Sequence, residues 1–215
     1  MALDTIDLVQ WKIIVSDICE MIEEKKDHLS KLDAACGDGD HGVSMARGFR
    51  AVSEKLDRYE ASDIGALLKM VGMTLVSVIG GATGPLFGTI FMRAGIASAG
   101  MTETSSSHIA EMFSAALEGI QERGKAQVGD KTMVDALSPA VDSVHTSAAE
   151  GRDVVETLDL AVKAARAGAD ATADMLARQG KGRYLGERAL GCQDAGANSI
   201  YHILESMYGS VKEST

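Results

Sequence analysis

The sequence is poor in proline, aromatic residues and cysteine. It has two prolines, 4% aromatic residues and three cysteines among 215 residues. Because strands of packed sheets are enriched in aromatic and β-branched residues, this composition favours helices. The cysteines are odd in number and widely spaced, at Cys19, Cys36 and Cys192, and no Cys-x-x-Cys pair occurs. These features argue against a disulfide framework and against a zinc site.

Long apolar runs and a strong positive charge are also missing. No stretch reaches the roughly 18 apolar residues that cross a bilayer, and the N-terminus has no basic run followed by an apolar stretch. We therefore expect a cytoplasmic protein without a signal peptide or membrane attachment. The formal charge is −10, from 21 basic and 31 acidic residues, which disfavours direct nucleic-acid binding. The same charge would repel a nucleotide, so any bound nucleotide needs bridging cations.

Apolar residues recur at helical spacing along most of the chain. In the first helix, which Asp4 or Thr5 would cap, the stripe begins with Leu8, Trp11 and Val15. Further helices are expected at residues 42–56, 63–79, 85–99, 108–123, 131–148, 154–178 and 196–211, with a polar loop at 100–107 and a kink at Pro139. No linker separates them, so residues 1–215 should form one all-α domain, an antiparallel bundle of eight helices.

Three aspartates gather between the first two expected helices. Asp33, Asp38 and Asp40 lie within eight positions, and Gly39 allows a tight turn between the last two. Carboxylate oxygens are the preferred ligands of hard cations such as Mg²⁺, so this segment is a candidate metal site. Asp and Gly are equally typical of a surface loop that caps a helix. His41 could bind a metal, pack against an adenine or accept a proton as a general base. It could equally do no more than hydrogen-bond a neighbouring carboxylate.

Three more segments combine glycines with unusual polar residues. Residues 80–89 form a glycine-rich loop that feeds a helix start, a geometry that suits an anion but also suits a tight turn. Residues 123–135 place Lys131 and Thr132 after a glycine turn, and residues 180–196 form a long connection. Each could be only a solvated turn. In an antiparallel array, however, all four segments fall at the same end, which predicts one composite site.

The motifs of these segments, in this order, resemble the ADP-binding (L) subunit of dihydroxyacetone kinase over nearly the whole chain. The chain is also similar to the C-terminal nucleotide domain of the ATP-dependent dihydroxyacetone kinases. The motifs that carry the resemblance are Asp38-Gly39-Asp40-His41-Gly42, Gly80-Gly81-Ala82-Thr83-Gly84-Pro85-Leu86-Phe87-Gly88, Gly129-Asp130-Lys131-Thr132-Met133 and Tyr184-Leu185-Gly186-Glu187-Arg188.

The resemblance implies an eight-helix barrel with a nucleotide at one mouth and two Mg²⁺ ions that bridge its phosphates. It implies that Asp33, Asp38 and Asp40 hold the metal ions. The residues that it places around ADP or ATP are His41, Gly42, Val43, Ser44, Ala82, Thr83, Gly124, Thr132, Met133, Lys181, Asp194, Ala195 and Gly196. The position of Lys181 departs from the family pattern, and Arg183 is the alternative.

The resemblance further implies a kinase subunit that works with partners. A K-type subunit would hold the ketose and supply the acid and base, so no catalytic residue is assigned here. In the phosphotransferase-system version, an M-type subunit rephosphorylates the bound ADP. Gly39 is more typical of ATP-dependent members, so direct ATP use, on dihydroxyacetone or on another ketose such as erythrulose, stays open. Three other functions stay open for this sequence. They are a nucleotide-sensing regulator of a transcription factor, the nucleotide domain of a fatty acid kinase and a plain helical scaffold.

Overall fold

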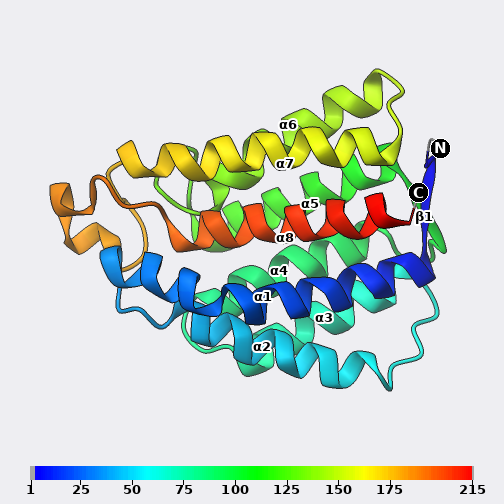
Figure 1. The fold of residues 1–215 in the computed structure, drawn as a ribbon, viewed down its shortest axis with the longest axis horizontal. Coiled ribbons are helices and arrows are strands. Elements are labelled where there is room, and N and C mark those ends of the chain that lie inside the picture. The colour runs from blue at the N-terminus through cyan, green and yellow to red at the C-terminus, as the bar shows by residue number, and fades with distance from the viewer. Residues whose placement is uncertain (1–2, 215) are drawn as a thin grey trace.

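Helices dominate the computed structural model, which describes residues 3–214 (Figure 1). The described chain contains eight α-helices, three short 3₁₀ helices and two three-residue strands. In order these are β1 Thr5–Asp7, α1 Leu8–Cys36, α2 His41–Leu56, α3 Ile64–Val78, α4 Thr83–Ala97, β2 Glu103–Ser105, α5 Ser106–Gly124, α6 Met133–Ala149, α7 Val154–Ala171, η1 Thr172–Asp174, η2 Gly182–Tyr184, η3 Gly186–Ala189 and α8 Ala195–Glu213.

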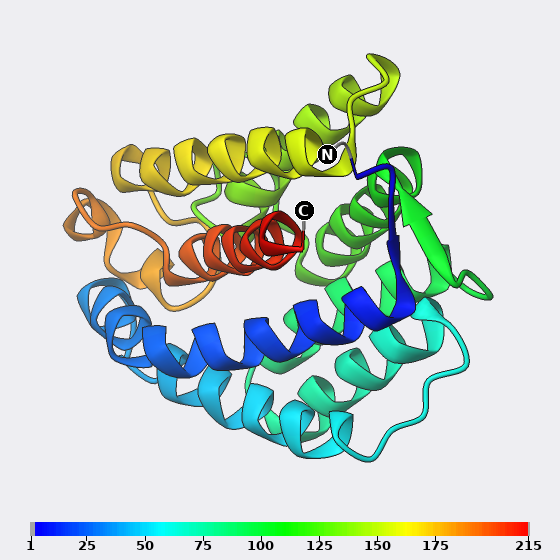
Figure 2. The same ribbon diagram turned by 45° about the vertical axis from the view of Figure 1, so that its right-hand side comes forward.

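The eight helices form a closed ring, which confirms the all-α fold expected from the sequence. Each helix contacts the next along the chain, and α8 returns to contact α1. Figure 2 shows this closure, with α8 in red lying beside α1 in blue. The connections reverse the chain direction after each helix (Figure 1), so neighbouring helices are antiparallel. The connections after α1, α3, α5 and α7 therefore lie at one end, to the left in Figure 1.

The opposite end carries a small antiparallel sheet that the sequence reasoning did not expect. Thr5, placed at the start of the first helix, lies in β1 instead, and part of the expected loop at 100–107 forms β2. The register pairs Ile6 with Thr104, and the Trp11 indole donates to the Thr104 hydroxyl at 2.8 Å. The first helix begins at Leu8 because the Asp7 carboxylate, rather than Asp4 or Thr5, caps it by accepting from the Gln10 N–H.

The buried apolar side chains of the described residues form one core cluster inside the ring. Phe49 and Phe87 are among the largest side chains that are fully buried. Small residues bring the helices together at selected points. A methyl group at Gly42 would lie 2.0 Å from the Lys26 carbonyl oxygen on α1, so α2 can start this close to α1 only with glycine there.

The ends of three helices differ from the sequence prediction. The seventh helix stops at Ala171 instead of Arg178, because the chain turns into η1 and the Thr172 carbonyl accepts a hydrogen bond from the Lys131 ammonium. The fourth helix starts at Thr83, before Pro85, and the sixth starts at Met133 rather than Lys131. The sixth helix continues through Pro139 to Ala149. No helix among residues 3–214 is long and apolar enough to cross a membrane.

Candidate nucleotide and metal site

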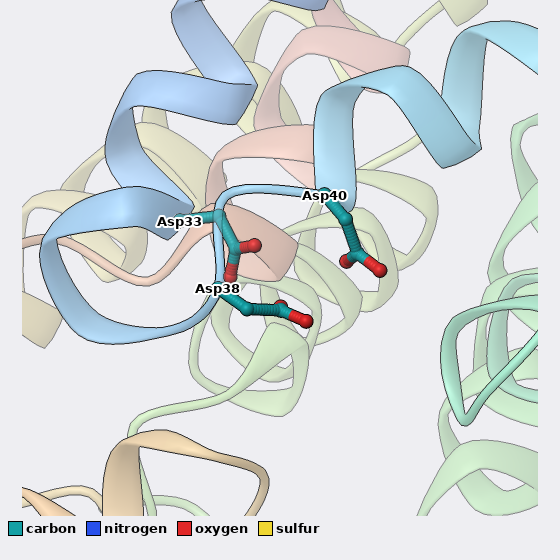
Figure 3. Close-up of side chains that lie close together, drawn as sticks. All are labelled: Asp33, Asp38 and Asp40. Carbon is teal, nitrogen blue, oxygen red and sulfur yellow. The ribbon is translucent and has the colours of Figure 1, made fainter.

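The three aspartates of the first motif meet in space, as Figure 3 shows. One carboxylate oxygen from each of Asp33, Asp38 and Asp40 lies within 4.8 Å of the others. Asp33 comes from the last turn of α1, Asp38 from the turn that follows and Asp40 from the residue before α2. Asp33 is half-buried and its partners are exposed, so the cluster opens toward solvent.

These carboxylates differ in how far the fold already uses them. Asp33 accepts from the His41 backbone N–H at 3.2 Å, and Asp38 pairs with the Lys181 ammonium. Asp40 precedes α2 but makes no side-chain capping bond, unlike Asp7, which caps α1. A helix start favours a capping carboxylate. The Asp40 side chain is turned instead toward the other two carboxylates, where it is available to a ligand.

Lys181 brings a positive charge from a distant part of the sequence to this cluster. Its hydrogen bond to Asp38 raises the pKa of Lys181, and the same contact holds the pKa of Asp38 below its usual range. Arg183, the alternative expected from the sequence, is exposed and lies over the Tyr184 ring at 4.7 Å. The geometry thus places Lys181, and not Arg183, against the aspartates.

The donor set fits magnesium. Three carboxylates converge without any thiol or imidazole among the gathered atoms, and hard cations prefer oxygen ligands of this kind. Three mutually close negative charges also repel one another, and a single ammonium offsets only part of that repulsion. A divalent cation held by these residues would neutralise the rest.

His41 begins α2 next to the cluster and points into the protein. Its Nε2 atom lies 2.8 Å from the Ser199 hydroxyl on α8, and its ring packs near Phe87 on α4 at 6.0 Å. Burial lowers the pKa of His41 to about 4, despite the opposing effect of Asp33, so the imidazole is neutral at neutral pH. Of the next residues, Gly42 is buried, Val43 is exposed and Ser44 is half-buried.

The glycine-rich loop leads into α4 at the same end. Ala82 precedes the helix and provides no side-chain capping bond, so no side chain caps the backbone N–H groups of the first turn. Gly81 has a φ of +67°, a left-handed conformation that favours glycine. Ala82 is exposed and Thr83 half-buried. Gly124 lies at the end of α5, where an added methyl group would meet Leu86 of α4 at 3.2 Å.

The turn before α6 is held by Asp135. This buried carboxylate accepts from the N–H groups of Gly129 at 2.5 Å and Thr132 at 2.8 Å. The Thr132 hydroxyl in turn caps the helix by accepting from Val134. Lys131, between them, has a φ of 60° and is only 3% exposed, so its ammonium is directed into the protein.

The Lys131 ammonium is bound by three carbonyl oxygens of the chain between α7 and α8, residues 172–194, which we call the connecting segment. It donates to Thr172 at 2.7 Å, to Ala189 at 2.8 Å and to Cys192 at 2.6 Å. One buried cation thus joins the start of this segment to two residues near its end. The backbone of Arg178 adds a bond to Asp130 at 3.1 Å.

The end of the connecting segment forms the start of α8. The Asp194 carboxylate caps the helix by accepting from the Ala197 N–H at 2.7 Å. Burial raises the pKa of Asp194 to about 6, with a smaller contribution from Asp135, and the residue as a whole is half-buried. Ala195 is buried, and Gly196 lies beside Met133, whose Cβ would be 3.7 Å from an added methyl group.

The structure therefore brings most of the sequence-predicted residues to one end, through contacts that join the four segments. Asp33, Asp38 and Lys181 meet directly, whereas Thr132 is occupied as a helix cap. Sequence reasoning did not select Lys131 or Ser199. The motif around Lys131 was visible, but a lysine in a glycine turn is usually solvated, so its burial could not be foreseen.

Comparison with known proteins identifies relatives of the whole chain. The model of the DAK2 domain family matches residues 35–209, so Asp33 lies just before the match. The chain is 40% identical over 213 residues to the "PEP-dependent dihydroxyacetone kinase, ADP-binding subunit DhaL" of Escherichia coli (strain K12), covering 99% of this chain and 100% of that protein. It is 32% identical over 189 residues to the L-erythrulose kinase of Pectobacterium atrosepticum, covering 87% of this chain and 32% of that protein.

The fold matches a solved structure as well. The dihydroxyacetone kinase of C. freundii, crystallised in complex with AMP-PNP and Mg²⁺, superposes with a TM-score of 0.74 and 27% identity. The match covers 97% of this chain and 35% of that one, so the chain spans about a third of the C. freundii protein. The chain belongs to the DAK2 domain family and, within it, to the family of dihydroxyacetone kinase ADP-binding subunits, which are kinases.

Proposed function

We propose that this chain is the ADP/ATP-binding subunit of a Mg²⁺-dependent kinase that phosphorylates dihydroxyacetone or a related small ketose held by a partner K-type subunit. The observation that carries the proposal is the convergence of Asp33, Asp38 and Asp40 at the end where the other three motifs meet. The relative named an ADP-binding subunit and the C. freundii complex with AMP-PNP and Mg²⁺ support it.

The metal ions follow from the charge of the site. Asp33, Asp38 and Asp40 would hold Mg²⁺, two ions in our proposal, and the ions would supply charge neutralisation for the phosphates. Without cations the carboxylates would repel a nucleotide. Lys181 adds a direct positive charge, since its ammonium already lies at Asp38 and can turn to a phosphate oxygen.

The surrounding backbone would hold the remaining parts of the nucleotide. The start of α4, at Ala82 and Thr83, offers backbone N–H groups that no side chain caps, and a helix start favours an anion. We assign the nucleoside side to Gly124, Thr132, Met133 and residues 194–196, and the first turn of α2, from His41 to Ser44, to the region between. The neutral His41 would act by packing and hydrogen bonding rather than by charge.

The ketose and the acid and base groups are proposed to lie on the partner. At this end of the ring the chain leaves apolar side chains exposed, among them Val43 at 55%, Val128 at 63% and Tyr184 at 73%. Exposed apolar groups around a polar site are typical of a protein interface. We infer that the K-type subunit docks on this rim and places the ketose hydroxyl at the terminal phosphate.

The phosphoryl donor defines a second candidate. The relative in Escherichia coli is named PEP-dependent, which favours an M-type subunit that rephosphorylates ADP in place. The L-erythrulose kinase relative favours a related ketose as the acceptor. Direct use of ATP is the alternative donor that we keep for this candidate. In either case the phosphoryl group passes to a ketose hydroxyl, and the nucleotide is left as ADP.

A reconstituted transfer reaction tests the proposal. The chain is mixed with a purified dihydroxyacetone-binding K-type subunit, and ketose phosphate is measured with ATP, or with PEP and the phosphotransferase proteins. We expect product only when the chain is present, and a loss of about 100-fold or more in Asp40→Asn because charge stabilisation is removed. Asp57→Asn, an exposed carboxylate after α2, is the control. Product formation without the chain, or an unaffected Asp40→Asn variant, would overturn the proposal.

A further inference from the structure

Two of the three cysteines lie near each other beside the candidate site, although they are 156 positions apart in the sequence. Cys36 is the last residue of α1, and Cys192 lies in the connecting segment just before α8. Figures 1 and 2 both show this segment, in orange, next to the end of α1. The helix α1 also contacts η3 within the segment.

Hydrogen bonds bring the two cysteines around the same buried ammonium. The Cys36 thiol donates to the Ala189 carbonyl oxygen at 3.7 Å, and that oxygen also accepts from Lys131 at 2.8 Å. Lys131 in turn holds the Cys192 carbonyl oxygen at 2.6 Å. Burial, and then the nearby Cys192 thiol, raise the pKa of Cys36 to about 11.

Neither of these two cysteines is fully buried. Cys36 and Cys192 are partly exposed, whereas Cys19 lies in the core at 7% exposure. We propose that Cys36 and Cys192 form a redox-sensitive dithiol whose closure to a disulfide fastens the connecting segment to the end of α1. Closure itself does not depend on the proposed function. Any effect on the nucleotide does rest on it, because the segment carries Lys181 and Asp194.

The oxidant is a low-molecular-weight disulfide such as oxidised glutathione. One cysteine thiolate attacks this disulfide, forms a mixed disulfide and releases one glutathione thiolate, which takes up a proton. The second cysteine then attacks the protein sulfur of the mixed disulfide and releases the second glutathione thiol. In total, two protein thiols lose two electrons and two protons, and one glutathione disulfide becomes two thiols.

A disulfide between Cys36 and Cys192 would add a covalent restraint to the connecting segment, which polar contacts hold in place. The connecting segment is attached by the bonds of Lys131, by the Lys181–Asp38 pair and by the backbone of Arg178. Several of its basic side chains are exposed, with the Arg178 side chain at 74% and Lys181 at 62%. Trypsin cleaves such sites when the backbone opens locally, so closure should slow cleavage.

The test is equilibration of the whole chain with glutathione redox buffers, followed by mass spectrometry under denaturing conditions. We expect the loss of two hydrogen masses, a peptide that links Cys36 to Cys192, and reversal by dithiothreitol. Samples are followed until the mass no longer changes, so that the result reports the thiol–disulfide equilibrium. Cys36→Ser and Cys192→Ser should each abolish the linkage, while Cys19→Ser should retain it.

Tryptic cleavage between Arg178 and Arg188 is then compared in the oxidised and reduced chains, without nucleotide. We expect cleavage to be slowed about 5-fold or more in the oxidised chain, and the melting temperature to rise by at least about 5 °C. Only free thiols, or only glutathione adducts on single cysteines, at equilibrium would overturn the dithiol. A disulfide that leaves both cleavage and melting temperature unchanged would overturn the restraint. Neither outcome depends on whether ADP binds.

Discussion

Replacing Lys131 by methionine should release the connecting segment from α6. The side chain donates three hydrogen bonds of 2.6–2.8 Å from a buried position. Hydrogen bonds from a charged donor contribute about 1.5–3 kcal/mol each, and the burial of one ammonium costs several kcal/mol. Methionine fills a similar volume but leaves three carbonyl oxygens without their donor. We therefore expect a net loss of about 3 kcal/mol in the free energy of unfolding.

The assay combines thermal unfolding with limited proteolysis. For a chain of 215 residues, a loss of about 3 kcal/mol corresponds to a fall of roughly 6–12 °C in melting temperature. Cleavage by trypsin after Arg178 should accelerate before global unfolding, because the lost bonds are local to the segment. Lys125→Met is the matched control, since Lys125 has a similar left-handed φ of 54° but an exposed side chain. A fall of under 2 °C in Lys131→Met, with unchanged cleavage, would refute this reasoning.

Three further predictions concern the same end of the ring. Gly42→Ala should lower the free energy of unfolding, measured by urea denaturation, by about 3 kcal/mol, because the new methyl group meets the Lys26 carbonyl oxygen at 2.0 Å. Gly209→Ala on α8 is the control: open space surrounds this position, so the same substitution should raise the free energy of unfolding by about 0.5–1 kcal/mol. The raised pKa of Asp194, about 6, means that its ionisation destabilises the folded state as the pH rises from about 4 to 6. Asp194→Asn keeps the helix cap, so it should exceed the wild type in stability by about 1–2 kcal/mol at pH 8 and hardly differ at pH 4; equal pH dependence of the two would contradict this. The gain stays in this range because Asp194 is only half-buried and solvent screens its charge. Asp38→Ala should lose Mg²⁺-dependent nucleotide affinity in calorimetry with a change of under about 2 °C in melting temperature, since its exposed pair with Lys181 stabilises little; unchanged affinity would count against the metal assignment.

The helices and the aspartate cluster could be predicted because both are local in the sequence. Apolar spacing of three and four residues determines which face of a helix is buried, and α1 follows that spacing from Trp11 to Ile22. Three aspartates within eight positions can meet through one local turn, and Gly39, with a φ of +77°, permits that turn. In an antiparallel bundle, alternate loops lie at the same end. This rule predicts from the sequence that the four motifs lie at one end of the bundle.

The contacts between distant segments could not be predicted in this way. The pairing of Ile6 with Thr104 depends on how the packed helices position the two short strands β1 and β2 in space, and no local sequence pattern specifies it. The end of α7 depends on Lys131, which lies 41 positions from Thr172. The ion pair between Lys181 and Asp38 also joins distant segments, and no local pattern specifies it. These features follow from tertiary packing, which overrides local propensity.

The most direct test of the central claim is a calorimetric titration of ADP into the nucleotide-stripped chain, with and without Mg²⁺. The same titration with ATP compares the two donors, and Asp40→Asn and Asp57→Asn serve as the site variant and its control. Because the Asp40 carboxylate makes no capping bond, its loss should leave the fold intact. We predict Mg²⁺-dependent ADP binding in the wild type and in Asp57→Asn, and a loss of at least about 10-fold in affinity in Asp40→Asn. An ADP affinity that is the same without Mg²⁺ or in Asp40→Asn would contradict the account, and so would the absence of nucleotide binding.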